Sequence, residues 1–246
     1  MIQSQIEEKA DINWTNMLLF SITPLIALSI VPFYGFRHGY DTFEWIVFFI
    51  LLLFSGMSIT AGYHRLWSHK TYHAHPILRF IFALGGACAL QNDILHWASD
   101  HRRHHQFVDN NEKDPYSAKR GFWFSHIGWI LRNYKSGEED LSNVKDLASD
   151  PIVKFQHRHY LKLVLLTNIG LPFILGLIHG DVIGNLLLGG VLRLVLSQHS
   201  TYLINSAAHI WGRQPYSNTS TARDNTFLAL LTYGEGYHNY HHTFQW

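Results

Sequence analysis

The sequence has few of the features on which several common protein classes depend. It holds a single cysteine, Cys88, which excludes an intramolecular disulfide framework and a cysteine-based zinc module. Its 19 Lys and Arg residues are balanced by 18 Asp and Glu residues, so it has no basic excess with which to neutralise nucleic-acid phosphates. No nucleic-acid partner is therefore expected. Cys88 stands in an apolar stretch and is expected to be a small buried side chain.

Several kinds of segment are missing too. There is no internal repeat, no low-complexity tract and no recognisable domain boundary, so residues 1–246 are expected to form a single domain. The first residues lack the basic stretch and the small-residue cleavage site of a signal peptide. The first apolar segment is therefore expected to belong to the mature protein.

Long uncharged runs dominate what is present. Residues 14–36, 45–63 and 163–178 contain no Asp, Glu, Lys or Arg, and residues 182–204 contain only Arg193. A bilayer core about 30 Å thick needs about 20 apolar residues in a helix. The sequence therefore predicts an all-α integral membrane protein with four transmembrane helices, at about 15–36, 44–63, 161–179 and 182–204. Arg193 would be costly in lipid, so we expect it to face the bundle interior, either as a structural partner or near a substrate channel.

The basic residues predict which side of the membrane each loop occupies. Most Lys and Arg residues lie between residues 64 and 159, whereas the connection after the first span offers only Arg37 and the last connection offers none. By the positive-inside rule, residues 64–160 and 205–246 are expected to form a cytosolic helical cap. A bacterial cytoplasmic membrane is favoured over the endoplasmic reticulum. Residues 77–90 are apolar but too few to span, which favours an interfacial or re-entrant segment.

Histidine is the unusual component, with 18 residues, half of which fall into spaced groups. The groups are His64 and His69; His101, His104 and His105; His209; and His238, His241 and His242. Positions three and four apart share a helix face, so each triplet is expected to converge on one point. A spacing of five residues corresponds to about 140° on an α-helix. His64 and His69 therefore fit either a helix end that frays at the interface or ligands of two different metals.

These groups are predicted to meet at one membrane face, because two crossings separate the first pair of groups from the second. Neutral imidazole is the commonest metal ligand, and these groups exceed the roughly four to six ligands that one ion takes. A di-metal site is therefore expected. Fe, Zn and Cu all suit nitrogen ligands, and iron is the one that can activate oxygen.

The remaining histidines are interpreted as ordinary polar residues: His38, His73, His75, His96, His126, His157, His159, His179 and His199. The spaced groups themselves could instead form an incidental histidine-rich surface or a patch for anionic lipid heads, although Lys and Arg would serve lipid without this spacing. A metal transporter would also gather ligands at one face. It would need polar residues along the spans, and only Arg193, Gln198 and His199 offer any.

Four motifs resemble the histidine boxes of the stearoyl-CoA (delta-9 acyl) desaturase family, which are membrane-bound fatty acid desaturases. The motifs are His64-Arg-Leu-Trp-Ser-His69, His101-Arg-Arg-His104-His105, Asn205-Ser-Ala-Ala-His209 and His238-Asn-Tyr-His241-His242. The resemblance runs from about Gly56 to Gln245 and implies a four-span fold with a cytosolic cap and two iron ions. It assigns metal ligation to His64, His69, His101, His104, His105, His209, His238, His241 and His242, with Asn205 holding a metal-bound water.

The resemblance also implies a substrate and a reaction. Trp97 and Thr201 match positions at the bend of an acyl tunnel, and Asn92, Asp100 and Arg132 match positions near a CoA head group. The family uses O2 and two electrons from a carrier, cytochrome b5 or a ferredoxin-type protein, to insert a cis double bond. Here we expect a delta-9 bond in a fatty acyl-CoA. The haem motif His-Pro-Gly-Gly of cytochrome b5 is absent, so the electron donor is expected to be separate.

Two departures from the family pattern keep alternatives open. Ser99 stands where animal relatives carry an arginine directed to CoA phosphate, so an acyl-lipid is the alternative carrier. The chain stops at Trp246, shortly after the last box, whereas relatives continue, as expected of a trimmed chain or a fragment. A membrane di-iron hydroxylase of alkyl or acyl chains is the alternative function, and a metal-binding transporter is the distant one.

Overall fold

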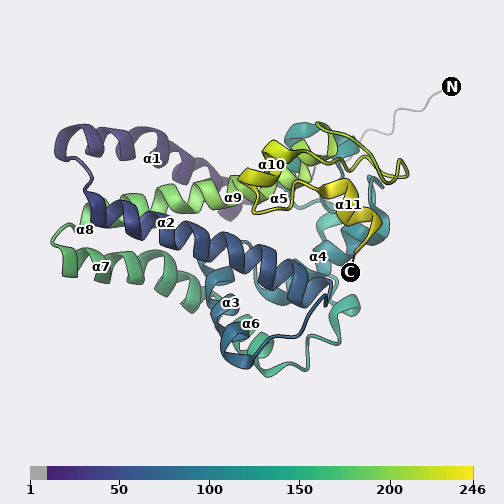
Figure 1. The fold of residues 1–246 in the computed structure, drawn as a ribbon, viewed down its shortest axis with the longest axis horizontal. Helices are drawn as coiled ribbons and strands as arrows, with labels where there is room; N and C mark the ends of the chain where they lie inside the picture. The colour runs from purple at the N-terminus through teal and green to yellow at the C-terminus, as the bar shows by residue number, and fades with distance from the viewer. Residues whose placement is uncertain (1–9, 246) are drawn as a thin grey trace.

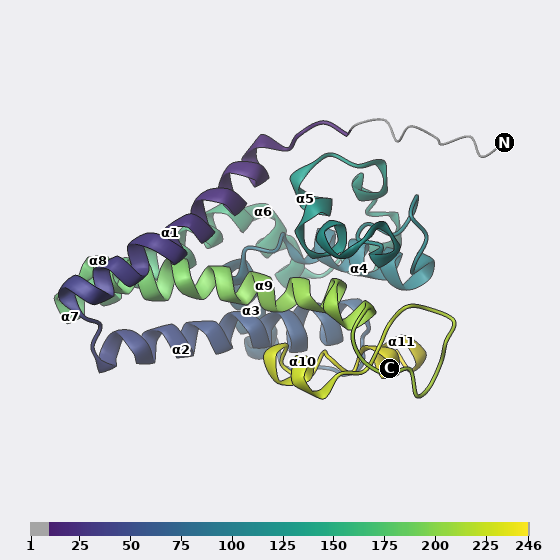
Figure 2. The same cartoon turned by 90° about the horizontal axis from the view of Figure 1, so that it is seen from above.

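The chain folds into helices joined by loops, and a computed structural model describes residues 10–245 (Figure 1). Long helices run side by side through one half of the molecule, while short helices and loops gather in the other half (Figures 1 and 2). In chain order the helices are α1 (Trp14–His38), α2 (Thr42–Met57), η1 (Ser58–Ser68), α3 (Pro76–Ala89), α4 (Ile94–Phe107), η2 (Ala118–Arg120), η3 (Phe124–Gly128), α5 (Trp129–Leu131), η4 (Lys135–Gly137), η5 (Ser142–Val144), α6 (Pro151–Leu165), η6 (Leu166–Gly170), α7 (Leu171–His179), α8 (Val182–Asn185), η7 (Leu186–Leu192), α9 (Arg193–Asn205), η8 (Ala207–His209), α10 (Thr226–Leu231) and α11 (His238–Thr243).

Four helical stretches are long and apolar enough to cross a membrane, which confirms the predicted number of spans. They are Trp14–His38, Thr42–Ser68, Pro151–His179 and Val182–His209. The third stretch begins well before the predicted boundary at residue 161. Two local signals explain this early start: Pro151 occupies the first turn, and the Asp150 side chain accepts hydrogen bonds from the first free amides.

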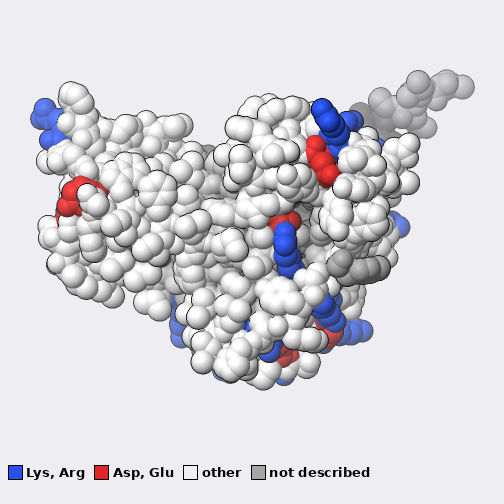
Figure 3. All heavy atoms as spheres, in the orientation of Figure 1, with Lys and Arg blue, Asp and Glu red and all other residues white. Residues whose placement is uncertain are grey.

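The outer surface of these stretches is apolar. On α1, the side chains of Leu25, Leu28 and Phe36 are 65%, 81% and 88% exposed. On the face drawn in Figure 3, charged side chains are sparse along the long helices; some lie at the left end, and most are spread over the half that holds the short helices and loops. An uncharged band of this kind is stable against hydrocarbon rather than water. The chain is therefore a multi-pass membrane protein.

α3 and α4 form a bent pair in place of a fifth straight span, with an angle of 81° between them. Leu90 and Asn92 lie in the break and have φ values of 51° and 76°, a left-handed conformation that ends α3. α3 packs against η1 and α6. Gly86 permits this close approach, because a Cβ there would lie 2.0 Å from the Tyr63 ring. The segment predicted to be interfacial or re-entrant thus ends at a sharp bend, and α4 returns to pack on η1.

Arg193 lies inside the fourth span and is fully buried. Its Nη1 donates to the carbonyl oxygen of Cys88 at 2.6 Å, and its Nη2 donates to Asn168 Oδ1 at 2.9 Å. Its Nε donates to the carbonyl oxygen of Gly189 at 3.0 Å. A buried guanidinium needs such partners. Of the two roles left open by the sequence, the structure shows the structural one, and Cys88 is buried as expected.

Replacing Arg193 with leucine should destabilise the fold. The Cys88 carbonyl and the Asn168 amide would lose charged donors, and hydrogen bonds to charged groups contribute about 1.5–3 kcal/mol each. We expect a clear drop in the thermal unfolding midpoint of the detergent-solubilised protein. Arg37→Leu, at the exposed end of α1, is the matched control and should unfold at the wild-type temperature. Equal midpoints for both variants would contradict the structural role.

Candidate metal centre and adjoining cavity

The spaced histidines form two adjacent clusters. The first cluster contains His64, His69, His101, His105 and His241, and the second contains His104, His209, His238 and His242. Within each cluster, one candidate ligand nitrogen from every imidazole lies within 4.8 Å of the others. The clusters meet where the rings of His105 and His242 stack, with a distance of 4.3 Å between their centroids. Each cluster therefore offers at least the four ligands that one metal ion commonly uses.

Each histidine triplet contributes to both clusters, contrary to the expectation that it would converge on one point. On α4, His101 and His105 belong to the first cluster and His104 to the second. On α11, His241 belongs to the first cluster, and His238 and His242 belong to the second. Viewed down the axis of an α-helix, the side chain at position i+4 is rotated to one side of the side chain at position i, and the side chain at position i+3 is rotated to the other side. α4 and α11 therefore run between the clusters, and each supplies ligands to both.

His64 and His69 belong to the same cluster, and the helix that carries His64 does not fray. η1 is a π-helix, in which backbone hydrogen bonds join residues five apart. One such bond joins the amide of His69 to the carbonyl oxygen of His64, at 3.0 Å. The two residues are therefore one π-helical turn apart and point to the same side. An α-helical estimate of their angle was wrong because the local helix is wider.

The imidazoles approach one another through Nε2. The Nε2–Nε2 distances are His64–His241 3.0 Å, His105–His241 2.9 Å, His69–His101 2.8 Å, His104–His242 3.2 Å, His209–His238 3.1 Å and His238–His242 3.0 Å. Two nitrogens that bind one metal ion, each with a bond of about 2.1 Å, lie at most about 4.2 Å apart. All of these distances are short enough for the paired nitrogens to share an ion.

Buried oxygen atoms face the other ring nitrogen, Nδ1, of several of these histidines. His104 Nδ1 lies 2.9 Å from Asp114 Oδ1, and His64 Nδ1 lies 3.1 Å from Glu235 Oε2. Both carboxylates are buried. An imidazole that donates from Nδ1 to a carboxylate keeps its proton there, which leaves the Nε2 lone pair directed into the cluster.

The His209 ring is also oriented with Nδ1 toward an oxygen atom, in this case the hydroxyl group of Thr221. Thr221 Oγ1 donates to Asp109 Oδ1 at 2.6 Å, so it accepts from His209 Nδ1 at 2.8 Å. His238 Nε2 then lies beside both His209 and His242, and a neutral imidazole has only one N–H to share between those contacts. A metal cation would satisfy all the converging lone pairs at once. The residues present therefore fit a metal ion in each cluster.

Burial favours the neutral form of six of these imidazoles. Desolvation first, and neighbouring histidines second, hold the pKa well below the usual histidine value for five of them: His101, His105, His238, His241 and His242. The same causes lower the pKa of His69 to about 3. Metal binding requires the unprotonated ring, so these six histidines are in the ligating form at neutral pH.

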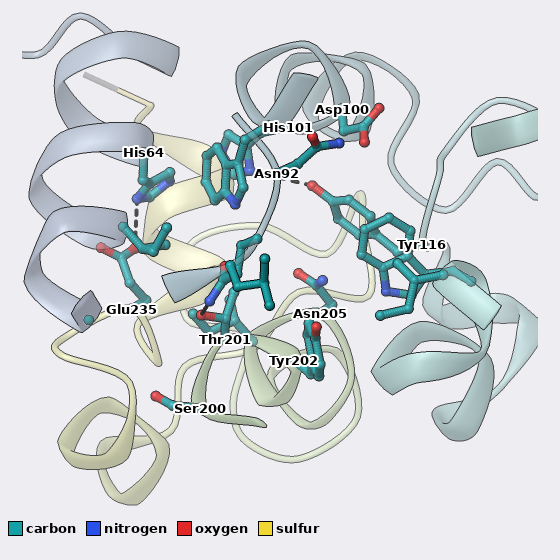
Figure 4. Close-up of a pocket in the computed structure, with 18 of the residues that line it drawn as sticks. His64, Asn92, Asp100, His101, Tyr116, Ser200, Thr201, Tyr202, Asn205 and Glu235 are labelled. Carbon is teal, nitrogen blue, oxygen red and sulfur yellow. Dashed lines mark hydrogen bonds and ion pairs between the residues drawn. The ribbon is translucent and has the colours of Figure 1, made fainter. Parts of the chain in front are cut away.

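A cavity of about 380 Å³ adjoins both clusters (Figure 4). His64 and His101 from the first cluster line it, as do His104 and His238 from the second. Its apolar lining includes Leu19, Phe20, Ile59, Leu90, Ile130, Leu161 and Ile204. Such a cavity suits an apolar ligand with a few fixed polar contacts.

Four of the five predicted substrate residues line this cavity, namely Asn92, Trp97, Asp100 and Thr201. The Trp97 ring stacks on His101 with a centroid distance of 4.9 Å, and Thr201 Oγ1 accepts from the side chain of Gln91 at 2.9 Å. These contacts fix the wall next to the first cluster.

Arg132 and Asn205 have different positions relative to the cavity. Arg132 does not line it and donates to the carbonyl oxygen of Ala10 at 2.8 Å. Asn205, the last residue of α9, does line it. Figure 4 shows Asn205 between Glu235 on one side and Tyr116 on the other.

The sequence reasoning missed the oxygen atoms behind the imidazoles. One signal was available, because Glu235-Gly-Tyr-His238 has the Glu-x-x-His spacing that soluble di-iron bundles use for two ligands. Here Glu235 lies against His64 instead. Asp114 lies in a loop and contacts His104. The spacing of these two residues in the sequence does not predict that contact.

The chain combines four apolar spans, two histidine clusters and an apolar cavity. Its residues 43–246 match the model of the family described as fatty acid desaturase. The chain belongs to this family. It is 43% identical over 235 residues to the probable acyl-CoA desaturase of Schizosaccharomyces pombe, covering 95% of this chain and 48% of that protein. It is 39% identical over 241 residues to the stearoyl-CoA desaturase of Bos taurus, covering 96% and 66% respectively. The Delta(9)-fatty-acid desaturase fat-7 of Caenorhabditis elegans is 40% identical over 251 residues, covering 98% and 72%. The chain thus spans about half the length of the yeast relative.

Asp114→Asn should weaken metal binding without changing the shape of the site. The uncharged amide oxygen is a weaker acceptor for His104 Nδ1 than the carboxylate, and loss of such a partner commonly costs about 10–100-fold in metal affinity. We expect less bound iron per purified chain, measured by plasma mass spectrometry after equilibration with a competing chelator. Asp146→Asn, which removes a partly exposed partner of Arg102 and Lys70, is the control. Wild-type iron affinity in Asp114→Asn would exclude the supporting role.

Proposed function

We propose that this protein is an O2-dependent fatty acyl desaturase that inserts a cis double bond, at delta-9, into a saturated acyl chain. The observation that carries the proposal is the apolar cavity whose wall includes histidines of both clusters. An acyl chain bound there lies within reach of both candidate metal positions. The names of the relatives, acyl-CoA, stearoyl-CoA and Delta(9)-fatty-acid desaturase, support the same reaction.

The proposed cofactors are two iron ions, one in each cluster, with O2 as co-substrate. The proposed ligands are His64, His69, His101, His105 and His241 for one ion and His104, His209, His238 and His242 for the other, with Asn205 holding a water molecule. Bound iron, with O2 and two electrons, supplies the oxidising power needed to remove two hydrogens from an unactivated chain. Asp114 would hold a proton on His104 Nδ1 and so keep its Nε2 available, and Glu235 is the carboxylate nearest to His64 Nδ1.

The chain's own contribution to the reaction is position and exclusion of water. Apolar side chains such as Leu19, Phe20 and Ile59 favour a hydrocarbon over water in the cavity. Trp97, held against His101, and Thr201, held by Gln91, restrict where the hydrocarbon lies relative to the clusters. Fixed placement of the reacting carbons determines which bond is oxidised.

Acyl-CoA is the proposed form of the substrate, because two of the three relatives named above carry CoA in their names. Asn92 and Asp100 are the proposed contacts near the head group, since both line the cavity. Arg103 donates to Asp100 Oδ1 at 2.5 Å, and burial raises the pKa of Asp100. Arg132 lies away from the cavity and Ser99 donates to the carbonyl oxygen of Asp140. We therefore propose no direct contact between the head group and Arg132 or Ser99.

We propose that the spans and the cap act as one domain, with both clusters on the cytosolic face. The bias of Lys and Arg toward residues 64–159 supports this orientation. The three relatives come from eukaryotes, which favours the endoplasmic reticulum over the bacterial membrane that the sequence analysis preferred. Electrons are proposed to come from a separate carrier, of the cytochrome b5 or ferredoxin type.

A hydroxylase would share the ligands and differ in its product. Metal transport has less support, because the guanidinium of Arg193 is hydrogen-bonded to two carbonyl oxygens and an amide oxygen inside the bundle. The product of the reaction therefore decides between the candidates.

Expression of the chain in a host that lacks its own desaturase should yield monounsaturated fatty acids. Mass spectrometry separates the outcomes, since desaturation removes two hydrogens and hydroxylation adds one oxygen. His104→Ala and His241→Ala each remove a ligand from a different cluster and should reduce product to background.

The control for that experiment is His73→Ala, because His73 is exposed and outside both clusters. It should retain wild-type product. Membrane levels of each variant are measured by immunoblot to exclude loss of protein. Hydroxylated product, or full desaturation by either cluster variant, would refute the proposal.

A further inference from the structure

A third group of potential ligands lies outside the two histidine clusters. Asp93, His96 and His157 form it, and none of them belongs to the cavity lining. Asp93 Oδ2 lies 2.7 Å from His96 Nδ1 and 3.1 Å from His157 Nδ1. The two imidazole rings stack with a centroid distance of 5.6 Å. One carboxylate oxygen is thus faced by two ring nitrogens from different helices, α4 and α6.

The local backbone fixes the orientation of Asp93. Its Oδ1 caps α4 by accepting from the amides of Leu95 and His96, at 2.9 and 3.3 Å. The capping contact leaves Oδ2 directed at the two imidazoles. The carboxylate therefore does not need to be reorganised to act as a ligand.

His96 has a second carboxylate behind it. Its Nε2 lies 3.0 Å from Glu139 Oε2. A proton held on Nε2 by Glu139 leaves the Nδ1 lone pair directed at Asp93 Oδ2, which is also an acceptor. In that tautomer only a positive charge between the two atoms makes the contact favourable, whereas a proton on Nδ1 makes it an ordinary hydrogen bond. The arrangement repeats the one in which Asp114 supports His104 and leaves its Nε2 free.

We propose that Asp93 Oδ2, His96 Nδ1 and His157 Nδ1 bind a zinc ion that joins the N-terminus of α4 to α6. Two imidazoles and one carboxylate are a ligand set that zinc uses, with a fourth position left for water. The site is reachable from solvent, since the His157 side chain is 42% exposed and the His96 side chain 22%. This inference rests on geometry alone and is independent of the proposed function.

The position of the site suggests what the ion would do. Asn92 precedes Asp93, Trp97 follows His96, and Tyr160 lies one helical turn after His157; all three line the cavity. An ion held between α4 and α6 would therefore fix the spacing of two cavity walls. Its role is that of a structural clamp.

The competing interpretation is an ion-pair cluster without a metal. In that case the positive charge between the acceptors is a proton, and the hydrogen bond to Asp93 raises the pKa of His96 to about 9. His96 would then be a cation between Asp93 and Glu139 at neutral pH. Direct measurement of bound zinc distinguishes the two.

The test uses the iron-loaded chain of residues 1–246 in detergent at pH 8, equilibrated with buffered free zinc and analysed by plasma mass spectrometry for both metals. Wild type should take up one zinc per chain with no loss of iron. His157→Gln, and Asp93→Asn, which can still cap α4 through its side-chain oxygen, should each lower zinc affinity at least tenfold while keeping wild-type iron. His159→Gln is the matched control, because His159 lies on the same helix outside the group, and it should bind zinc like wild type.

Three outcomes would overturn the proposal. The first is no added zinc in wild type, which leaves the ion pair as the whole explanation. The second is zinc uptake matched by an equal loss of iron, which assigns the zinc to the histidine clusters. The third is unchanged zinc affinity in His157→Gln and Asp93→Asn. Wild-type iron content in each variant confirms that it is folded, so a negative result cannot be attributed to unfolding.

Discussion

The convergence of imidazole lone pairs is the physical constraint on which this structure depends. Nε2 atoms lie 2.8–3.2 Å apart in two buried clusters, and neutral rings cannot supply enough protons for every such contact. Burial favours the neutral form of most of these rings, and Asp114, Glu235 and Thr221 contact the Nδ1 atoms of three of them, whose Nε2 atoms are directed inward. Folding and metal binding are therefore expected to be coupled, because each stabilises the arrangement that the other needs.

Backbone geometry determines how the ligands are divided. α4 and α11 run between the clusters and serve both, while the π-helical η1 allows His64 and His69 to serve one. The 81° bend before α4 brings that helix back to the end of η1. The same bend places Asn92 and Trp97 in the cavity wall, so the break in the chain positions both the candidate ligands and the proposed substrate contacts.

Carboxylates behind histidines recur in this protein. Asp114 and Glu235 lie behind members of the two clusters, and Glu139 lies behind His96 in the proposed zinc site. A carboxylate in this position favours a proton on the ring nitrogen that it contacts, which leaves the other nitrogen able to face a cation. From the sequence, His96 and His157 were interpreted as ordinary polar residues, although Asp93 stands three residues before His96. Their common partner, Asp93, is visible only after α6 packs beside α4.

The sequence alone determined the number of spans, the set of spaced histidines and their meeting at one end of the bundle. These follow from hydropathy, spacing and the count of crossings, which are local or additive properties of the chain. Tertiary structure alone decided the division of ligands between clusters, the support of His64 by Glu235 and the placement of Arg132 away from the cavity. The reason is that each depends on contacts between distant segments, as between His64 and His241, or on a π-helical backbone that residue spacing does not reveal.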